Sequence, residues 1–188
     1  MVPLSSLVLP VLLATILVFV ASSLVWTVLK WHDSDWKRVD REDTIMNGIR
    51  TAGLTAGQYT FPGAASRQPK TWTEEDSRKV NEGPMGMLVV YPPGPPQMAK
   101  ALGLWFILIL VISYAVAYIA SRTLAPGTEY LQVFRVTGAT SMLAYGAALP
   151  INAIFFGHTW SSTLRHIADA ILYGLLTAGA FGWLWPGM

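Results

Sequence analysis

The sequence has no cysteine among its 188 residues. Disulfide bonds, thiol nucleophiles and cysteine-based metal sites are therefore excluded, and the redox compartment stays open. Charge is also scarce: charged residues make up 13% of the chain. The charged residues after Lys100 are Arg122, Glu129, Arg135, Arg165 and Asp169. Most of the charge thus lies in one segment, about residues 30–100.

Common catalytic motifs are missing as well. The chain has no G-x-S-x-G elbow, no P-loop and no G-x-G-x-x-G loop. In the 30–100 segment ten basic residues are interleaved with nine acidic ones, so no basic patch for nucleic acid is formed. We expect no nucleic-acid partner, no cofactor and no catalytic residue.

Long apolar runs are the main positive feature. A helix rises about 1.5 Å per residue, so about 20 apolar residues cross the roughly 30 Å hydrocarbon core of a bilayer. Four uncharged, mostly apolar stretches reach or approach that length: Val2–Leu29, Ala101–Ser121, Val136–Gly157 and Ala170–Met188. They predict an all-α integral membrane protein, with the lipid bilayer as its first partner. We expect transmembrane helices at about 1–29, 101–121, 130–157 and 161–186.

The first stretch favours a retained membrane anchor over a cleaved signal peptide. No Lys or Arg precedes it, its apolar run is long, and no clear A-x-A site ends it. The small residues Ala21, Ser22 and Ser23 leave cleavage open. Tryptophans support the count of four helices, because they fall near the expected membrane borders: Trp26, Trp31, Trp105 and Trp160 on one side, Trp183 and Trp185 on the other.

The segment of residues 30–100 is expected to form a small α+β cap between helices 1 and 2. Acidic residues 40–43 precede Ile45, Met46 and Ile49 at helical spacing, and Gly53 follows. A second capped helix is predicted over about 71–81, and β-prone runs lie at 58–61 and 87–91. Two short strands and two short helices give too little core for stability on their own.

The distribution of Lys and Arg predicts the orientation. The 30–100 segment and the turn at 157–165 share one side of the membrane and carry eleven Lys and Arg residues. The other side carries Arg122 and Arg135. The positive-inside rule then puts the termini outside and the segment in the cytoplasm.

Asp169 is the main candidate for a functional polar residue. A carboxylate within an apolar helix costs a few kcal/mol, so it normally faces the protein interior and has a partner. Arg165 lies one turn earlier on the same face, His166 is adjacent, and Tyr173 follows on the stripe of Asp169. The functional hypothesis is a proton or ion site. The structural alternative, which we favour, is an interfacial ion pair that orients the helix.

The histidines give no metal signature in the sequence. His158 and His166 lie eight residues apart, and His32 stands beside Asp33 and Asp35. A metal site needs three or four converging ligands, and no H-E-x-x-H spacing is present. We expect no metal.

Small residues at four-residue spacing predict close helix packing. One stripe is Ala170, Gly174, Ala178 and Gly182, and a second is Thr140, Ala144 and Ala148. Small side chains let helix backbones approach in lipid. Packing of the third helix on the fourth is the favoured interpretation, and a homo-oligomer interface is the alternative.

The chain resembles a group of small bacterial inner-membrane proteins with no assigned activity. The resemblance rests on 83–86 (GPMG) running into 89–92 (VVYP), on 102–106 (LGLWF), on 124–128 (LAPGT) with 134–136 (FRV), and on 182–186 (GWLWP). It implies a bacterial source, a multi-pass inner-membrane location and the same four-helix layout, and it supplies no catalytic residue.

Two functions are compatible with these features. The leading hypothesis is a non-catalytic accessory or scaffolding component of a membrane complex, acting through protein partners. The alternative is a small oligomeric transporter or channel in which Asp169, Tyr173 and Thr177 line a polar track.

Overall fold

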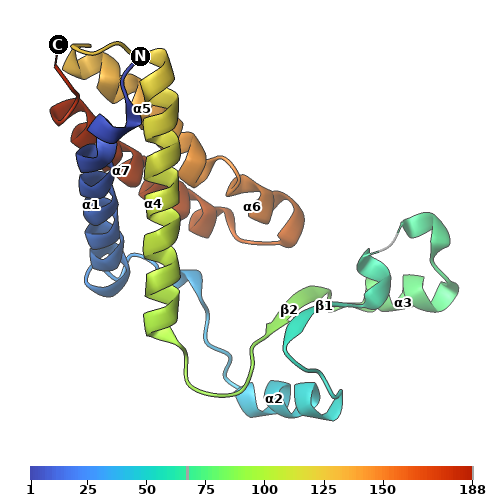
Figure 1. The fold of residues 1–188 in the computed structure, drawn as a ribbon. Helices are drawn as coiled ribbons and strands as arrows, with labels where there is room; N and C mark the ends of the chain where they lie inside the picture. Colours follow the sequence, from blue (N-terminus) through green and yellow to red (C-terminus); the bar gives the residue numbers. More distant parts are fainter. Residues whose placement is uncertain (67, 188) are drawn as a thin grey trace. The chain divides into compact units, whose positions relative to one another are not determined.

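The chain forms two compact units (Figure 1), and the computed structural model describes residues 1–66 and 68–187. One unit comprises residues 1–36 together with the chain from 97 onward, and the other comprises residues 37–96. Residues 30–36 and 97–100 of the expected 30–100 segment group with the helical unit. Arg67, in the loop expected after residue 63, and Met188, the end of the fourth apolar stretch, lie outside the described residues.

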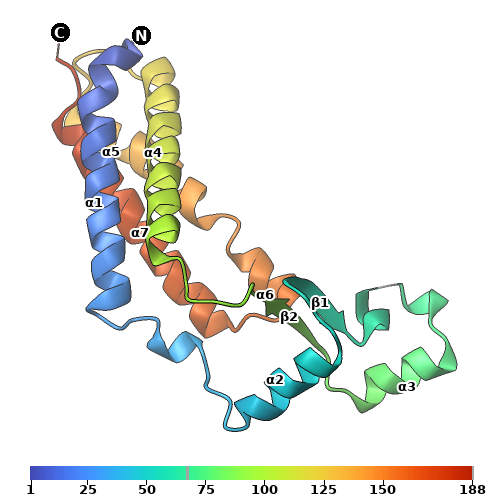
Figure 2. The ribbon, with the colours of Figure 1, turned by 60° about the horizontal axis from the view of Figure 1, so that its bottom comes forward.

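The helical unit is built from five helices: α1 (Val8–Thr27), α4 (Met98–Thr123), α5 (Tyr130–Gly146), α6 (Pro150–Phe156) and α7 (Trp160–Trp183). Helices α1 and α4 lie side by side along most of their length (Figures 1 and 2). Helix α7 packs against α1 and, most extensively, against α5. Apolar side chains from α1, α4, α5 and α7, among them Val11, Val116, Val133 and Phe181, form the core.

Three helical segments within the described residues are long and apolar enough to cross a membrane: Leu4–Thr27, Met98–Thr123 and Tyr130–Phe156. The prediction of four such segments is wrong for the last one. Helix α7 is long enough at 24 residues. Its first half lowers its apolarity, because it includes Arg165, His166 and Asp169 together with several hydroxyl side chains.

The third predicted helix is interrupted rather than continuous. Helix α5 ends at Gly146 and α6 begins at Pro150. Proline has no backbone N–H and its ring clashes with the carbonyl four residues earlier, so the break lies where the sequence requires it. Gly157 then reverses the chain with φ +72°, a left-handed conformation that glycine adopts without strain. Thr159 caps α7 through its side chain, which accepts from the N–H of Ser162.

Both ends of the described chain are tied to the same end of the helical unit (Figure 1). The N–H of Val2 donates to the carbonyl of Ser121 at 3.2 Å, and the N–H of Gly127 donates to that of Pro186 at 2.8 Å. The indole of Trp185 donates to the carbonyl of Ala125 at 3.0 Å. The end of α4 therefore holds the N-terminal segment, and the turn between α4 and α5 holds the C-terminal one.

Small residues of α7 form a close contact with α5, which we call the α5–α7 seam. A Cβ placed at Gly174 would come within 2.4 Å of Met142 Cγ and 3.2 Å of the Met142 backbone nitrogen. At Gly182 a Cβ would lie 2.7 Å from the ring of Tyr130. Ala170 and Ala178 also face α5, 3.0 and 3.1 Å from the positions a Cβ would take at Gly146 and Gly138. The stripe predicted on α7 thus packs within the chain.

The partner stripe on α5 is shifted from the predicted one. The residues in the seam are Tyr130, Gly138, Met142 and Gly146. Ala144 and Ala148 are exposed, and the Thr140 hydroxyl donates to the carbonyl of Val136 in its own helix. Both stripes have a spacing of four, so the sequence pattern alone does not decide which one faces α7.

The 37–96 unit contains two helices and a two-stranded sheet, as predicted. Helix α2 is Glu42–Thr51, strand β1 is Gly57–Phe61, helix α3 is Glu74–Glu82 and strand β2 is Gly86–Val90. The strands pair antiparallel, with Gly57 opposite Val90 and Phe61 opposite Gly86. A capping box begins α3, where the side chains of Thr73 and Asp76 each bond the other's backbone N–H.

This unit has almost no core of its own. Among its described side chains Ala64 is the only buried hydrophobic one. Ile45 and Met46 of α2 and Met87 and Val89 of β2 are about half exposed. The sequence expectation of a unit too small to be stable alone agrees with this low burial.

Candidate functional site

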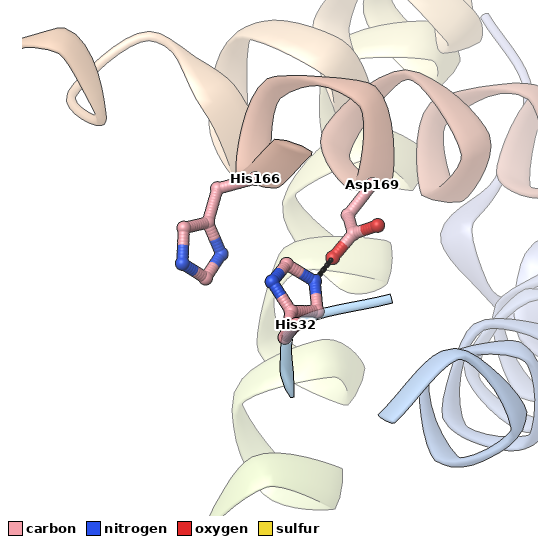
Figure 3. Close-up of side chains that lie close together, drawn as sticks. All are labelled: His32, His166 and Asp169. Carbon is pink, nitrogen blue, oxygen red and sulfur yellow. Dashed lines mark hydrogen bonds and ion pairs between the residues drawn. The ribbon is translucent and has the colours of Figure 1, made fainter. Parts of the chain in front are cut away.

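Asp169 is buried on α7, with 6% of its surface exposed. Its partner differs from the predicted one. Atom Oδ2 of Asp169 lies 2.8 Å from Nε2 of His32, a residue 137 positions earlier in the chain (Figure 3). Arg165, the predicted counter-charge one turn earlier, forms its ion pair with Asp35 instead.

The segment after α1 brings His32 and Asp35 to this place. Lys30 adopts a left-handed backbone with φ 49°, and the short 3₁₀ turn Asp33–Asp35 follows. The N–H of Asp35 donates to the carbonyl of His32 at 3.0 Å. In this turn the imidazole of His32 donates from Nδ1 to Oδ2 of Asp35 at 2.6 Å. One short turn thus positions both side chains against α7.

Together His32, Asp35, Arg165 and Asp169 form what we call the charge cluster. The side chains of His32 and Asp35 are each 3% exposed, and that of Arg165 is 28% exposed. Burial on its own raises the pKa of Asp35, but hydrogen bonds from His32 and Arg165 and their positive charge outweigh it and hold that pKa below its usual value.

The His32 ring lies between the two carboxylates of the charge cluster. Its Nδ1 is 2.6 Å from Oδ2 of Asp35, and its Nε2 is 2.8 Å from Oδ2 of Asp169. Trp26 stacks on the ring with centroids 4.1 Å apart. Asp35 also forms an ion pair with Arg165, so each buried carboxylate has a partner, as burial requires.

A cavity of about 820 Å³ adjoins the charge cluster. Its walls come from α1, α4, α5 and α7 and include Trp26, Leu102, Trp105, Leu108, Ile112, Ala144, Tyr145 and Tyr173. His166 and Asp169 line it as well. Trp105 is held in the wall, because its indole donates to the Ser22 hydroxyl at 2.9 Å. The predicted site residues His166, Asp169 and Tyr173 therefore face one space, and Arg165 joins them through Asp35.

The comparisons with known proteins found no relative of this chain. Comparisons with family profiles, with curated proteins and with solved structures gave no match. The resemblance to small bacterial inner-membrane proteins stays an expectation, and the site is interpreted from its own chemistry.

His32, His166 and Asp169 also form a possible metal-ligating group. One ligand atom from each lies within 4.8 Å of the others. In Figure 3 His166 and Asp169 extend from the same face of α7, and the ring of His32 lies next to the carboxylate. The sequence expectation of no metal considered His32 apart from Asp169, so it missed this arrangement.

Sequence reasoning missed His32 and Asp35 as members of the site. A signal was present. His32 follows the first apolar helix within a few residues, and Asp169 lies within ten residues of the start of the last one. In the predicted four-helix layout two crossings separate these positions, which predicts that both lie at the same membrane border.

Proposed function

We propose that this chain is a non-catalytic integral membrane protein that binds an amphipathic molecule in its cavity and serves as an accessory component of a membrane complex. The main support for this proposal is the cavity between the helices. Its walls come from four helices and are mostly apolar, and the polar side chains among them include His166 and Asp169. Its volume of about 820 Å³ fits a small-molecule site, which has this same mixture of apolar walls and a few polar groups.

The surface of the helical unit supports membrane insertion. Helix α1 exposes Leu9, Leu12, Ile16 and Val20, and α4 exposes Leu104, Ile107 and Val111. Such rows of apolar side chains suit contact with lipid, because exposing this much apolar surface to water is unfavourable. We place α7 across the bilayer as the fourth crossing, because the charges of Arg165 and Asp169 are paired and cost less there.

The 37–96 unit supports a role through partners. Its apolar side chains on α2 and β2 remain about half exposed, and it has little core. Contact with another surface would bury them. From the Lys and Arg distribution we place this unit in the cytoplasm of a bacterial cell and the termini outside.

The alternative of a transporter or channel has less support. Asp169, Tyr173 and Thr177 are all buried on one stripe of α7, as such a track requires. However, the Asp169 carboxylate is bonded to His32, and the Thr177 hydroxyl donates to the carbonyl of Tyr173 at 2.8 Å. These polar groups are thus used in holding the fold.

Filling the cavity tests the binding function. We expect Ala144→Trp to place an indole in the cavity and displace a molecule that co-purifies with the wild-type chain, because Ala144 lines this space. The measurement is mass spectrometry of small molecules extracted from detergent-purified protein, with background subtracted from empty micelles. The predicted loss is at least severalfold.

Ala139→Trp is the matched control, since Ala139 is an exposed residue of the same helix and does not line the cavity. It should retain the molecule at the wild-type level. The proposal fails if the wild type carries no enriched molecule, or if both tryptophan variants carry the same amount as the wild type.

A further inference from the structure

The ligand set formed by His32, His166 and Asp169 points to a second function, at side chains of which two also line the cavity of the proposed function. His166 and Asp169 are three residues apart on α7, so both side chains extend from one helix face. His32 approaches them from the segment after α1, and the three residues present two imidazoles and one carboxylate. A site made from two separate parts of the chain is fixed by the fold rather than by a local loop.

The Nδ1 edge of the His32 ring is bonded to Asp35. Its Nδ1 donates to Asp35 at 2.6 Å, and Arg165 in turn donates to the other oxygen of Asp35. Metal-bound histidines commonly donate their second N–H to a carboxylate, which fixes the tautomer and the ring orientation. Asp35 therefore keeps the proton on Nδ1 and directs Nε2 toward Asp169.

Nε2 of His32 and Oδ2 of Asp169 are close enough to bind one ion together. They lie 2.8 Å apart, and with His166 they bring one ligand atom each within 4.8 Å of the others. Imidazole nitrogens and carboxylate oxygens bind a metal in their deprotonated form, so a bound ion replaces any proton between the two atoms.

We propose that His32, His166 and Asp169 bind one divalent transition-metal ion of the Zn²⁺ or Co²⁺ class, with a fourth position open to the cavity. The donor set selects this class. Two imidazole nitrogens and one carboxylate suit borderline ions such as Zn²⁺, whereas Ca²⁺ requires six or more oxygen ligands. No thiolate is available for a soft ion, because the chain has no cysteine.

Binding requires a small movement of His166. Its ring stacks on that of His32 with centroids 4.6 Å apart and planes at 23°. Around a tetrahedral Zn²⁺ the ligand atoms lie about 3.4 Å apart, so the set must contract from its present spread. His166 lines the cavity, which gives its ring room to turn about its side-chain bonds.

Titration with Co²⁺ tests the proposal. The full chain is purified in detergent without a histidine tag, stripped with a chelator and titrated with Co²⁺ alone. We expect one Co²⁺ per chain, visible d–d absorption typical of four- or five-coordination, and displacement by Zn²⁺. His166→Ala should weaken binding at least tenfold, and it leaves the ion pairs of the charge cluster in place. Asp35 positions the His32 ring, so Asp35→Asn should weaken Co²⁺ binding by about tenfold to a hundredfold.

His158→Ala is the control, because His158 is exposed and lies outside the ligand set. It should bind Co²⁺ like the wild type. The proposal is overturned if the wild type takes up no stoichiometric Co²⁺, if His166→Ala binds as tightly as the wild type, or if His158→Ala loses the absorption as fully as His166→Ala. Circular dichroism of each variant establishes that its helices are intact.

Discussion

Replacing Asp35 with alanine is expected to lower the free energy of unfolding of the helical unit by about 3 kcal/mol. The side chain of Asp35 is 3% exposed and bonds both His32 and Arg165. Its removal leaves the Arg165 guanidinium and the Nδ1 of His32 without their shared acceptor. The estimate lies at the low end for a broken buried pair, because Arg165 keeps partial contact with solvent. Unfolding in mixed detergent micelles, followed by tryptophan fluorescence, measures the change.

Asp33→Ala is the matched control for that change. Asp33 lies two residues earlier in the same turn and is exposed. An exposed substitution of this kind usually changes stability by less than about 0.5 kcal/mol. Equal losses for the two variants would show that the charge cluster does not hold this segment against α7.

The second large effect is expected in the α5–α7 seam. Gly174→Leu should destabilise the helical unit by about 3 kcal/mol, because the side chain must displace Met142 and separate the helices. Its first atom alone would lie 2.4 Å from Met142 Cγ and 3.2 Å from the backbone nitrogen of Met142. The same micelle unfolding assay reports the loss.

Gly179→Leu provides the comparison on the same helix. A Cβ at Gly179 meets no atom within 4 Å, so leucine is accommodated there. Helix propensity even favours leucine over glycine by about 0.5–1 kcal/mol. If Gly174→Leu and Gly179→Leu were equally stable, the close approach of α5 and α7 would be wrong.

Local signals predicted the 37–96 unit well. The acidic residues before Ile45 gave a helix that begins at Glu42, and Gly53 follows it with φ +66°. Thr73 and Asp76 formed the capping box that begins α3. Each of these signals acts between residues a few positions apart, where the sequence spacing fixes the geometry.

Predictions that depended on contacts between helices were less successful. The small residues of α7 face α5 as expected, but the partner stripe on α5 contains Gly138 and Met142 rather than Thr140 and Ala144. A four-residue spacing is shared by both stripes, and only the rotation of α5 about its axis separates them. That rotation is set by the packing of the whole unit.

The site itself could be predicted only in part. Burial of Asp169 and its need for a partner followed from the cost of an unpaired charge in an apolar helix. The partner did not follow, because Arg165 at i−4 satisfied the local rule while His32, 137 residues away, makes the contact. Selecting it requires knowledge of where the segment after α1 turns, which Lys30 and the 3₁₀ turn decide.

The most direct test of the account is the sidedness of α7. Because the chain has no cysteine, single cysteines can be introduced at His158→Cys, before α7, and at Gly187→Cys, after it. A membrane-impermeant maleimide is added to intact bacterial spheroplasts that express either variant. We expect labelling of Gly187→Cys from outside and labelling of His158→Cys only after the membrane is opened. Labelling of both positions from the same side would contradict a crossing by α7.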